Sequence, residues 1–351
     1  MSRAGMSGRG MWGGARWRML VVVLVLAAAG VAGWLWHDLD RFSRTPLHVQ
    51  TAGSSIDIAK GSGFKQIVAQ LRGQGLSEAS PLYWRALAER MQVAGKLHAG
   101  EYALPPGITP RALLDDMASG RVLQHDFTIV DGWTFAELRA ALDKTGKLQH
   151  LTTGLDDAAL MQMIGAPGEA PEGRFLPETY AYVKGDSDLD LLKRAHAAMR
   201  KTLDALWPGR DGDLPLATPY DALILASIVE KETGRADERK RIAGVFVRRL
   251  ENHMLLQTDP SVIYGMGASY AGNIRRSDLT TDTPYNTYTR AGLPPTPIAL
   301  PGKPAIEAAL HPAPGNELYF VARGDGTHVF SSTLAEHNHN VACYQLKRCQ
   351  R

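Results

Sequence analysis

Cysteine and net charge are both scarce in this sequence of 351 residues. The two cysteines, Cys343 and Cys349, are close enough in sequence to form one disulfide in an oxidising compartment, and nothing suggests a catalytic role for them. The formal charge is only +3, and the four arginines before residue 19 exceed it, so the rest of the chain is close to neutral. The pI of 8.8 is therefore no argument for a nucleic-acid partner.

The sequence also lacks the residue frames of common metal sites, since it contains neither HExxH nor CxxC. Four histidines nevertheless cluster late in the chain: His311, His328, His337 and His339. The stretch LYFVARGDGTHVF predicts a hairpin with His328 on its returning strand, and His337 falls in a helix start that follows. We expect these histidines to make structural hydrogen bonds, and we expect no metal and no other cofactor.

What is present is the composition of a folded protein. Hydrophobic residues make up 44% of the chain and charged residues 21%, which excludes wholesale disorder. A chain of this length predicts two or three domains.

An uncharged run over residues 19–36 is long enough to cross a bilayer as a helix. Trp34 and Trp36 stand at its far end, where an interfacial aromatic belt would place them. Arginines and no acidic residue precede it, so the positive-inside rule places residues 1–18 in the cytoplasm and the rest outside it. A cleaved signal peptide is the alternative. We expect an uncleaved anchor, because the run is long and the tryptophans occupy the usual place of small cleavage-site residues.

The chain after this run divides into four parts. Residues 37–47 are interpreted as a polar linker, and residues 48–122 as a small α+β domain with extended segments and amphipathic helices. Residues 123–345 are richer in proline and aromatic residues, and we expect a larger domain of mixed helix and sheet there. Residues 346–351 form a short tail. The predicted fold class is α+β, with one membrane helix in front.

Two segments, Gly61–Leu71 and Gly132–Leu142, align without gaps. Each has an aromatic residue three positions after its first glycine, followed by apolar positions three and seven residues later. Two copies do not predict a solenoid. They suggest that the same strand–turn–helix unit is used twice.

A helix is predicted over about residues 219–233. Thr218 is a suitable N-cap, Pro219 suits the first helical position, and Asp221 completes a capping-box-like pair. Gly234 suits the position after the helix end.

Two glutamates near the end of this helix fall on different faces. Leu225, Ile228 and Val229 form an apolar face, and Glu232 falls in its middle at about 100° per residue. Glu230 falls nearly opposite and is expected to be a solvated surface acid. A carboxyl among apolar side chains is anomalous, so Glu232 is the candidate for chemistry.

The predicted surroundings of Glu232 suit a general acid. Apolar neighbours and the negative end of the helix dipole both raise its pKa, as a proton donor working near neutral pH requires. The alternative is a structural glutamate paired with Arg235 or Arg239. The spacing leaves both interpretations open.

Several long stretches then occur in a fixed order: SIVEKETG, RIAGVFVRRL, LQTDPSVIYGMG, YNTYTRAGLPPTPIALPG and HVFSSTLAEHN. Together they resemble the endolytic murein transglycosylase family, the MltG/YceG-like proteins, and the similarity runs from about residue 48 to the C-terminus. The resemblance implies a single-pass inner-membrane enzyme facing the periplasm, with a LysM-like subdomain over residues 48–122 and a catalytic transglycosylase domain over residues 123–345.

The resemblance also implies the activity. It implies cleavage of the MurNAc–GlcNAc β-1,4 bond within peptidoglycan glycan strands to leave 1,6-anhydro ends, alongside peptidoglycan synthases. The family's catalytic glutamate corresponds to Glu232, and Thr233 stands where soluble lytic transglycosylases have serine. The family more often has glycine at Thr296 and asparagine at Leu300, which leaves the shape of that loop open.

One carboxyl suffices for such a reaction, because Glu232 can protonate the glycosidic oxygen and then accept the proton of the MurNAc C6 hydroxyl. A lysozyme-type hydrolase would need a second carboxylate across the bond. The available candidates are Asp259, Asp282, Glu172 and Glu178. Two further rivals are a non-enzymatic wall-binding anchor that grips glycan through residues 48–122, and a metal-dependent amidase.

Candidate sugar-binding side chains combine hydroxyls, amides and aromatic rings. They are Gln257, Asp259, Tyr264, Tyr285, Asn286, Thr287 and Tyr288. The alternative for Asp259 is that it merely starts a helix or turn with Pro260. Glu172, Gly173 and Tyr180 are weaker candidates for another wall of the same cleft.

Overall fold

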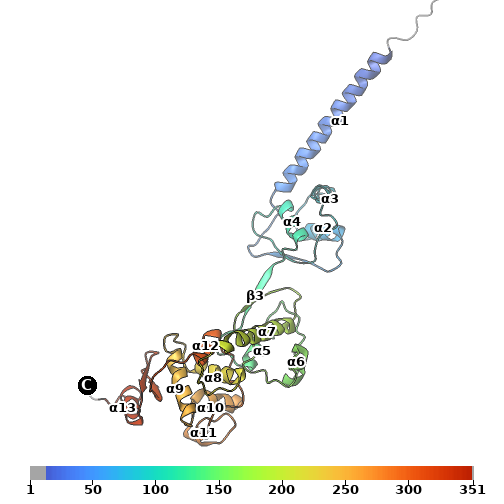
Figure 1. Ribbon diagram of the computed structural model, residues 1–351. Coiled ribbons are helices and arrows are strands. Elements are labelled where there is room, and N and C mark those ends of the chain that lie inside the picture. Colours follow the sequence, from blue (N-terminus) through green and yellow to red (C-terminus); the bar gives the residue numbers. More distant parts are fainter. Residues whose placement is uncertain (1–12, 350–351) are drawn as a thin grey trace, which may run out of the picture. The chain divides into compact units, whose positions relative to one another are not determined.

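The computed structural model describes residues 13–349, with the backbone alone for residues 13–16 (Figure 1). The chain forms two compact units, which divide between Gln124 and His125. Helices and short strands are mixed in both, in agreement with the predicted α+β class, and each sheet of the described chain has two strands.

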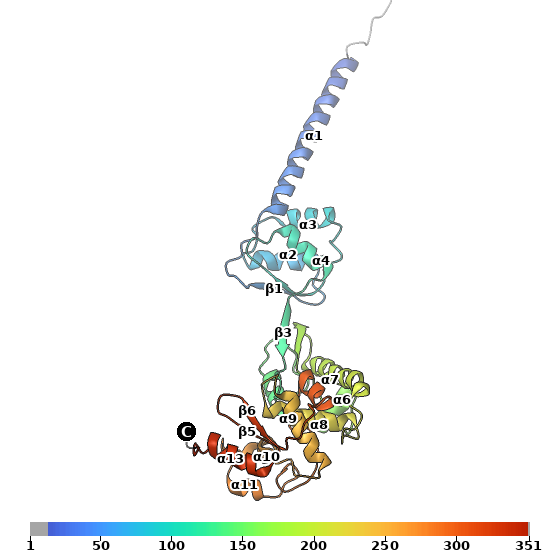
Figure 2. The ribbon, with the colours of Figure 1, turned by 60° about the vertical axis from the view of Figure 1, so that its left-hand side comes forward.

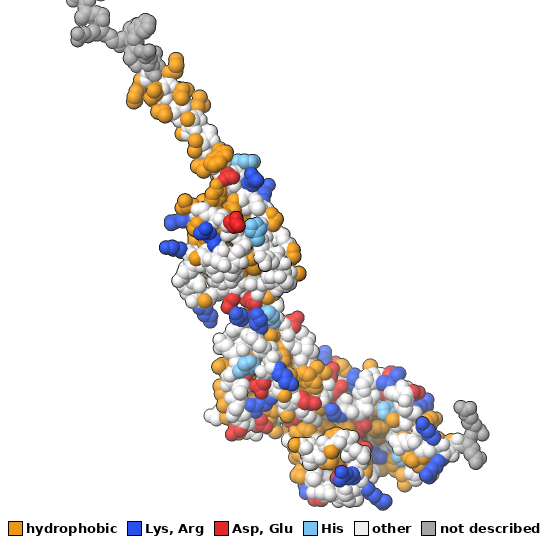
Figure 3. Space-filling model, turned by 180° about the vertical axis from the view of Figure 1, so that it is seen from behind, with side chains coloured by type: hydrophobic (Ala, Val, Ile, Leu, Met, Phe, Trp, Pro, Cys, Tyr) orange, Lys and Arg blue, Asp and Glu red, His pale blue; other side chains and the backbone are white. Residues whose placement is uncertain are grey.

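Helix α1, Gly13–Arg44, contains the long apolar run. The apolar side chains from Trp17 to Trp36 are exposed and form the orange rod in Figure 3. Among the described residues, this is the one helix long and apolar enough to cross a membrane, a property that membrane spans and signal sequences share. The predicted orientation rests partly on Arg3, Arg9 and the side chain of Arg16, which lie outside the described residues.

The segment after residue 36 differs from the expected linker, because α1 continues to Arg44 and its end packs on the first unit. Phe42 meets the rings of Tyr83 and Trp84 edge to face, with centroids 5.6 and 5.4 Å away. Asp38 accepts a hydrogen bond from the Tyr83 hydroxyl. Leu39 and Phe42, which pack on the core of the first unit, are separated by polar residues in the sequence, so these apolar contacts were not predicted.

The first unit contains β1 (Ser55–Ile58), α2 (Phe64–Gly73), α3 (Pro81–Arg90), β2 (Gly100–Ala103) and α4 (Pro110–Ser119). Strands β1 and β2 pair antiparallel, with Ile56 opposite Tyr102. Both of these side chains are buried in a core that α2, α3 and α4 share.

The predicted repetition of a strand–turn–helix unit is confirmed. Strand β1 leads into α2, and β3 (Gln124–Thr128) leads into α5 (Phe135–Leu142). Gly61 and Gly132 stand at matching turns with φ of 83° and 80°, a conformation that favours glycine. At the start of each helix, the side chain of the third residue (Gln66 or Glu137) accepts a hydrogen bond from the backbone N–H of the N-cap residue.

The second unit is mainly helical. Its first part contains β3, α5, α6 (Asp157–Ile164), β4 (Thr179–Val183), α7 (Asp188–Leu206) and the 3₁₀ helix η1 (Trp207–Gly209). The central part contains α8 (Pro219–Glu232), α9 (Arg239–Glu251), α10 (Asp259–Met266), the 3₁₀ helix η2 (Gly267–Ser269), α11 (Arg276–Thr280) and α12 (Lys303–Leu310). The last part contains β5 (Tyr319–Ala322), β6 (His328–Ser331) and α13 (Leu334–Tyr344). Strands β3 and β4 pair with each other, and β5 and β6 form the predicted antiparallel hairpin, on which α13 packs (Figure 2).

Helix α8 is the central element of the second unit. Its predicted start is confirmed, since Thr218 caps the helix and Asp221 returns a hydrogen bond to the Thr218 N–H at 2.9 Å. Residues 222–229 are all buried, because α9, α10 and α12 pack around the helix. Helix α8 is therefore covered on every side, and the sequence had predicted only one buried face. It ends at Glu232, followed by Thr233 in an extended conformation.

The expectation that Glu230 is a solvated surface acid is wrong. Its side chain is 7% exposed, and Arg239 Nη2 lies 3.7 Å from its Oε1. The backbone N–H of Gly302, at the start of α12, donates to its Oε2 at 3.0 Å. The sequence spacing allowed an ion pair between Glu232 and an arginine. In the structure, Arg239 lies beside Glu230 instead, on the face of α8 that α12 covers.

Candidate active site

Glu232 is the last residue of α8, and its carboxyl faces a cavity. The Thr258 hydroxyl, just before α10, donates a hydrogen bond to Glu232 Oε1. Neither Arg235 nor Arg239 pairs with Glu232: Arg235 bonds Asp237, and Arg239 lies at Glu230. The side chain therefore has a hydroxyl partner and no basic partner in direct contact among the described residues.

Burial raises the pKa of Glu232 to about 6. The Thr258 hydrogen bond opposes this effect, the charge of Asp259 adds to it, and the charge of His328 opposes it. Near neutral pH, a carboxyl with such a pKa exists in both its protonated and its ionised form. It can therefore donate a proton and take one back.

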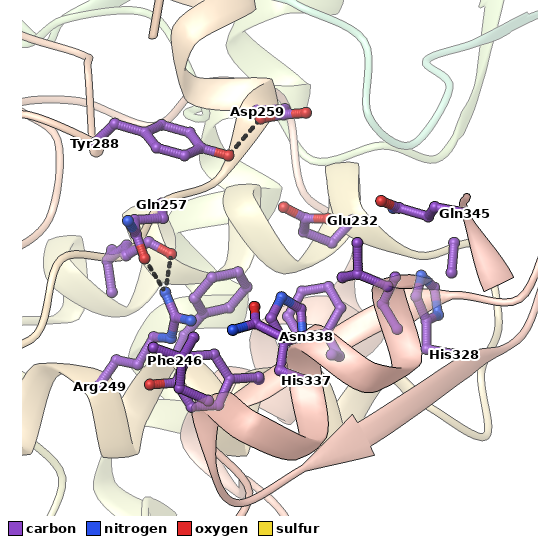
Figure 4. Close-up of a pocket in the computed structure, with 17 residues that line it drawn as sticks. Glu232, Phe246, Arg249, Gln257, Asp259, Tyr288, His328, His337, Asn338 and Gln345 are labelled. Atoms are coloured by element: carbon purple, nitrogen blue, oxygen red, sulfur yellow. Dashed lines mark hydrogen bonds between the residues drawn. The ribbon is translucent and has the colours of Figure 1, made fainter. Parts of the chain in front are cut away.

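The cavity has a volume of about 570 Å³ and lies between α8, α9, α10, the β5–β6 hairpin and α13. In Figure 4, Tyr288 and Asp259 lie at its top, His337 and Asn338 at its bottom, and Glu232 between them. Its lining side chains come from Glu232, Phe246, Arg249, Leu256, Gln257, Asp259, Tyr288, Tyr319, Phe320, Val321, Ala322, His328, Leu334, His337, Asn338, Val341 and Gln345. Aromatic rings with a few amides and carboxyls are the mixture that a sugar can contact on its faces and through its hydroxyls.

Asp259 and Tyr288 are two predicted sugar-binding residues that line this cavity together. The Tyr288 hydroxyl donates to Asp259 Oδ1 at 2.6 Å. Asp259 is exposed, and it is also the first residue of α10, so the simpler interpretation of Asp259 as a helix start is correct as well. The cavity thus holds a shielded carboxyl, Glu232, and a solvated one, Asp259.

Gln257 is the third predicted residue in the cavity, and a buried arginine fixes the loop that presents it. Arg249 donates to the carbonyls of Leu255 and Leu256 at 3.0 and 2.9 Å, and to Gln257 Oε1 at 3.3 Å. Gln257 itself has φ of 54°, an unusual value for a residue with a side chain. The arginine therefore holds the backbone turn that aims Gln257 at the cavity.

Tyr264 and Tyr285 lie outside the cavity and form a cluster with Glu172. Their rings meet edge to face at 4.9 Å, and the Tyr264 hydroxyl donates to Glu172 Oε2 at 3.1 Å. Glu172 is buried, which raises its pKa to about 7, and it also accepts from the Phe135 N–H at the start of α5. This cluster joins α5 and α10, with Glu172 buried and both tyrosines half-buried.

The expectation that Asn286 and Thr287 line the cleft is wrong, since both side chains are buried. The Asn286 side chain donates to the carbonyls of Asp278, Leu279 and Thr281. Thr287 Oγ1 accepts from the Thr258 N–H at 3.0 Å. These polar side chains satisfy loop backbone and leave only Tyr288 of the YNTY stretch at the cavity.

The other weaker candidates also lie away from the cavity. Gly173 has φ of 78° and packs close to Pro297, and the buried Tyr180 hydroxyl donates to the Leu176 carbonyl. Of the possible second carboxylates, Asp282 is exposed and paired with Arg290. Among the acids proposed for that role, only Asp259 lines the cavity with Glu232.

The C-terminal segments form a wall of the cavity that the sequence patterns did not predict. His328 on β6, and His337 and Asn338 on α13, line the cavity. The hydrogen bonding expected of the histidines holds for His328, whose Nδ1 lies 2.7 Å from Glu238 Oε2. It does not hold for His337 Nδ1, which is buried with no hydrogen-bond partner among the described residues while the ring stacks on Tyr319. These residues lie within the HVFSSTLAEHN stretch, which is the part of the sequence from which this wall could have been predicted.

The two cysteines lie beyond this wall and are joined in a disulfide that ties the end of α13 to the following turn. His339 Nε2 lies 3.5 Å from Cys343 Sγ, and the two sulfurs and this nitrogen are clustered. A disulfide sulfur carries no thiolate charge, so this group fits a structural role better than a metal site.

Three comparisons relate the chain to known proteins. The sequence model of the YceG-like family matches residues 56–343. An endolytic murein transglycosylase of Bacillus subtilis (strain 168) is 30% identical over 306 residues, covering 81% of this chain and 82% of that protein. An endolytic murein transglycosylase of Streptococcus pneumoniae serotype 2 is 27% identical over 363 residues, covering 92% of this chain but only 64% of that longer protein.

The fold is also similar to a solved structure. The crystal structure of a YceG-like protein from Listeria monocytogenes is 29% identical and superposes with a TM-score of 0.51, covering 82% of this chain and all of that one.

Proposed function

The chain belongs to the YceG-like family, and from this premise we propose that it is a lytic transglycosylase that cuts the glycan strands of peptidoglycan. Two relatives with the name endolytic murein transglycosylase support the reaction class. The observation that carries the proposal is Glu232, a shielded carboxyl with a pKa of about 6 in a cavity lined by aromatic and amide side chains.

We propose that Glu232 performs both proton transfers. In its protonated form it donates to the glycosidic oxygen between MurNAc and GlcNAc, and the bond from C1 to that oxygen breaks. The C6 hydroxyl of MurNAc closes on C1, and its proton passes to the Glu232 carboxylate. The products are a free GlcNAc hydroxyl, a 1,6-anhydroMurNAc end and Glu232 in its starting form. Asp259, Gln257 and Tyr288 are proposed to hold sugar hydroxyls and acetamido groups.

The surroundings of this reaction are part of the same proposal. Residues 19–36 of α1 serve as an uncleaved inner-membrane anchor with the N-terminus in the cytoplasm, and the chain after residue 36 faces the periplasm. The β1–α2–α3–β2 order of the first unit supports a LysM-like, glycan-gripping module. Cutting strands as peptidoglycan synthases make them would limit strand length.

A second candidate function is a lysozyme-type hydrolase, and the position of Asp259 favours it. A shielded acid and a solvated carboxylate in one cavity form the pattern in which one group protonates the leaving oxygen and the other acts on the opposite face of the sugar. Water would then take the place of the C6 hydroxyl. The two reactions leave different ends, reducing for the hydrolase and 1,6-anhydro for the transglycosylase.

Mass spectrometry of sacculi digested with the full chain in detergent tests the proposal. Wild-type protein is expected to release internal fragments with anhydro ends. Glu232→Gln keeps the shape but cannot donate a proton as an acid, so we expect a loss of about 10² to 10⁴ in rate. Glu307→Gln is the matched control, since Glu307 on α12 is a half-exposed acid outside the cavity.

Each outcome separates the candidates. Anhydro ends that disappear in Glu232→Gln but persist in Glu307→Gln support the transglycosylase, and reducing ends that disappear in Asp259→Asn support the hydrolase. If wild-type protein binds sacculi without cutting them, both enzymatic functions are refuted and the wall-binding anchor is the remaining hypothesis. Activity that survives Glu232→Gln at the wild-type rate would refute the role of Glu232.

A further inference from the structure

His328 shares the cavity with Glu232, and a shielded carboxylate fixes its ring. Glu238 Oε2 lies 2.7 Å from His328 Nδ1, and Glu238 Oε1 accepts from the His328 backbone N–H at 3.0 Å. The side chains of His328 and Glu238 are 13% and 10% exposed, so the pair is shielded from solvent. The ring of Phe320 packs edge to face against the imidazole at 5.5 Å. These contacts leave the imidazole one orientation.

This orientation decides which ring atom serves the cavity. Because Nδ1 is bonded to Glu238, the Nε2 edge is the polar edge left for the cavity, and no hydrogen bond within the described chain uses it. Burial alone would raise the pKa of Glu238, but the hydrogen bonds and charge of His328, together with the charge of Arg235, outweigh burial and lower it. The Glu238 carboxylate accepts from Nδ1 of this ring, and it carries the charge opposite to that of an imidazolium.

We propose that His328, held by Glu238, is a positioning residue for the reaction, whose positive ring stabilises the carboxylate that Glu232 becomes after it donates its proton. The inference rests on the proposed function of Glu232. The two residues of this pair come from elements far apart in the sequence, since Glu238 precedes α9 and His328 begins β6.

The other groups that face the two residues set the direction of the effect. Asp259 and Tyr288 face Glu232 from α10 and the loop after α11, and Thr258 donates to it. His337 on α13 lines the same cavity, and Arg235 lies near Glu238.

Burial and Asp259 favour the protonated form of Glu232, whereas Thr258 and His328 favour the ionised form. Without the positive ring, the pKa of Glu232 rises, so Glu232 ionises at higher pH and is a weaker proton donor. The limb of kcat/KM that falls as the acid ionises should therefore move to higher pH, and kcat should fall.

The test measures kcat and KM of the full chain in detergent on uncrosslinked glycan strands, from about pH 5 to 9. In both His328→Gln and Glu238→Gln, we expect the falling limb to shift upward by roughly half to one pH unit, with a several-fold loss of kcat and little change in KM. The double variant should shift no further than either single one, because the two residues act as one unit. His328→Lys keeps a positive charge beside Glu238 and should hold the limb near its wild-type position.

His311→Gln is the matched control. His311 also pairs through Nδ1 with a carboxylate, Asp211, at 2.8 Å, but it lies outside the cavity with a side chain that is 38% exposed. A purely structural role of His328 would lower the amount of folded enzyme without moving the limb.

The proposal is overturned if Glu238→Gln leaves the limb in place, or if His311→Gln moves it equally. Glu238→Gln decides the matter even where His328→Gln fails to fold, because the amide keeps the shape and an acceptor oxygen. A failure of the proposed function itself looks different, since wild-type protein would then make no anhydro ends at any pH.

Discussion

Replacing Thr258 by valine removes the one hydroxyl that donates to Glu232, with little change in shape. Thr258 is 1% exposed, so valine fills the same space, and two backbone contacts survive the change. The Thr258 N–H still donates to Thr287 Oγ1 at 3.0 Å, and the Thr258 carbonyl still accepts from Ser261 at 2.8 Å. The variant therefore isolates a single hydrogen bond to the carboxyl.

The sign and size of the effect follow from that bond. A donor stabilises the ionised carboxylate, so its loss raises the pKa of Glu232 from its present value of about 6. A hydrogen bond to a charged group contributes about 1.5–3 kcal/mol, and one pKa unit corresponds to about 1.4 kcal/mol, so we expect a rise of about one to two units. A general acid works while protonated, and the falling limb of kcat/KM should move upward by the same amount.

The assay is the pH profile of strand cleavage, measured beside Thr289→Val. Thr289 also bonds a carboxylate, Asp282 Oδ1 at 2.9 Å, but on an exposed surface outside the cavity, so this control should keep the wild-type profile. A limb that stays in place in Thr258→Val, or moves to lower pH, would contradict the assignment of Glu232 as the acid held by Thr258.

Two further predictions concern the stability of the second unit, measured by urea unfolding. Glu230→Ala leaves Arg239 and the Gly302 N–H without their partner and should lower the free energy of unfolding by about 3 kcal/mol. A decrease below about 1 kcal/mol would mean that solvent replaces these contacts. Gly302→Ala places a methyl group against Asp131 and should cost about 1–3 kcal/mol, whereas Gly209→Ala meets nothing within 4 Å and should stay within about 0.5 kcal/mol. Equal effects in these two glycine variants would rule out the predicted overlap.

Local signals in the sequence predicted local structure well. The cap at Thr218, the start at Pro219 and the end of α8 depend on neighbouring residues, and the two matching strand–turn–helix units depend on glycines at equivalent turns. Glu232 could be proposed from the sequence because its anomaly is local too, a carboxyl among apolar neighbours on one helix.

Contacts between segments that are far apart in the sequence could not be predicted from local sequence patterns. The residues next to Glu230 in the sequence do not indicate that Gly302 and the start of α12 cover it. Its burial therefore could not be predicted from helical periodicity alone. The same limit applies to Asn286, whose amide donates to backbone carbonyls in and just after α11, and to Phe42 in the expected linker, which packs on α3. His328 was visible in a motif, but its place beside Glu232 depends on how the hairpin docks.

The docking of the hairpin has a consequence for how the protein is made. Glu232 ends α8 near the middle of the second unit, whereas β5, β6 and α13 emerge from the ribosome only after α12. A nascent chain that has reached α12 carries the acid on an open surface, without the imidazole of His328 and without the wall of α13. Any activity that depends on the complete cavity is thereby withheld until translation has passed α13, and a chain cut between α12 and β5 would keep its acid but lose the walls that the hairpin and α13 supply.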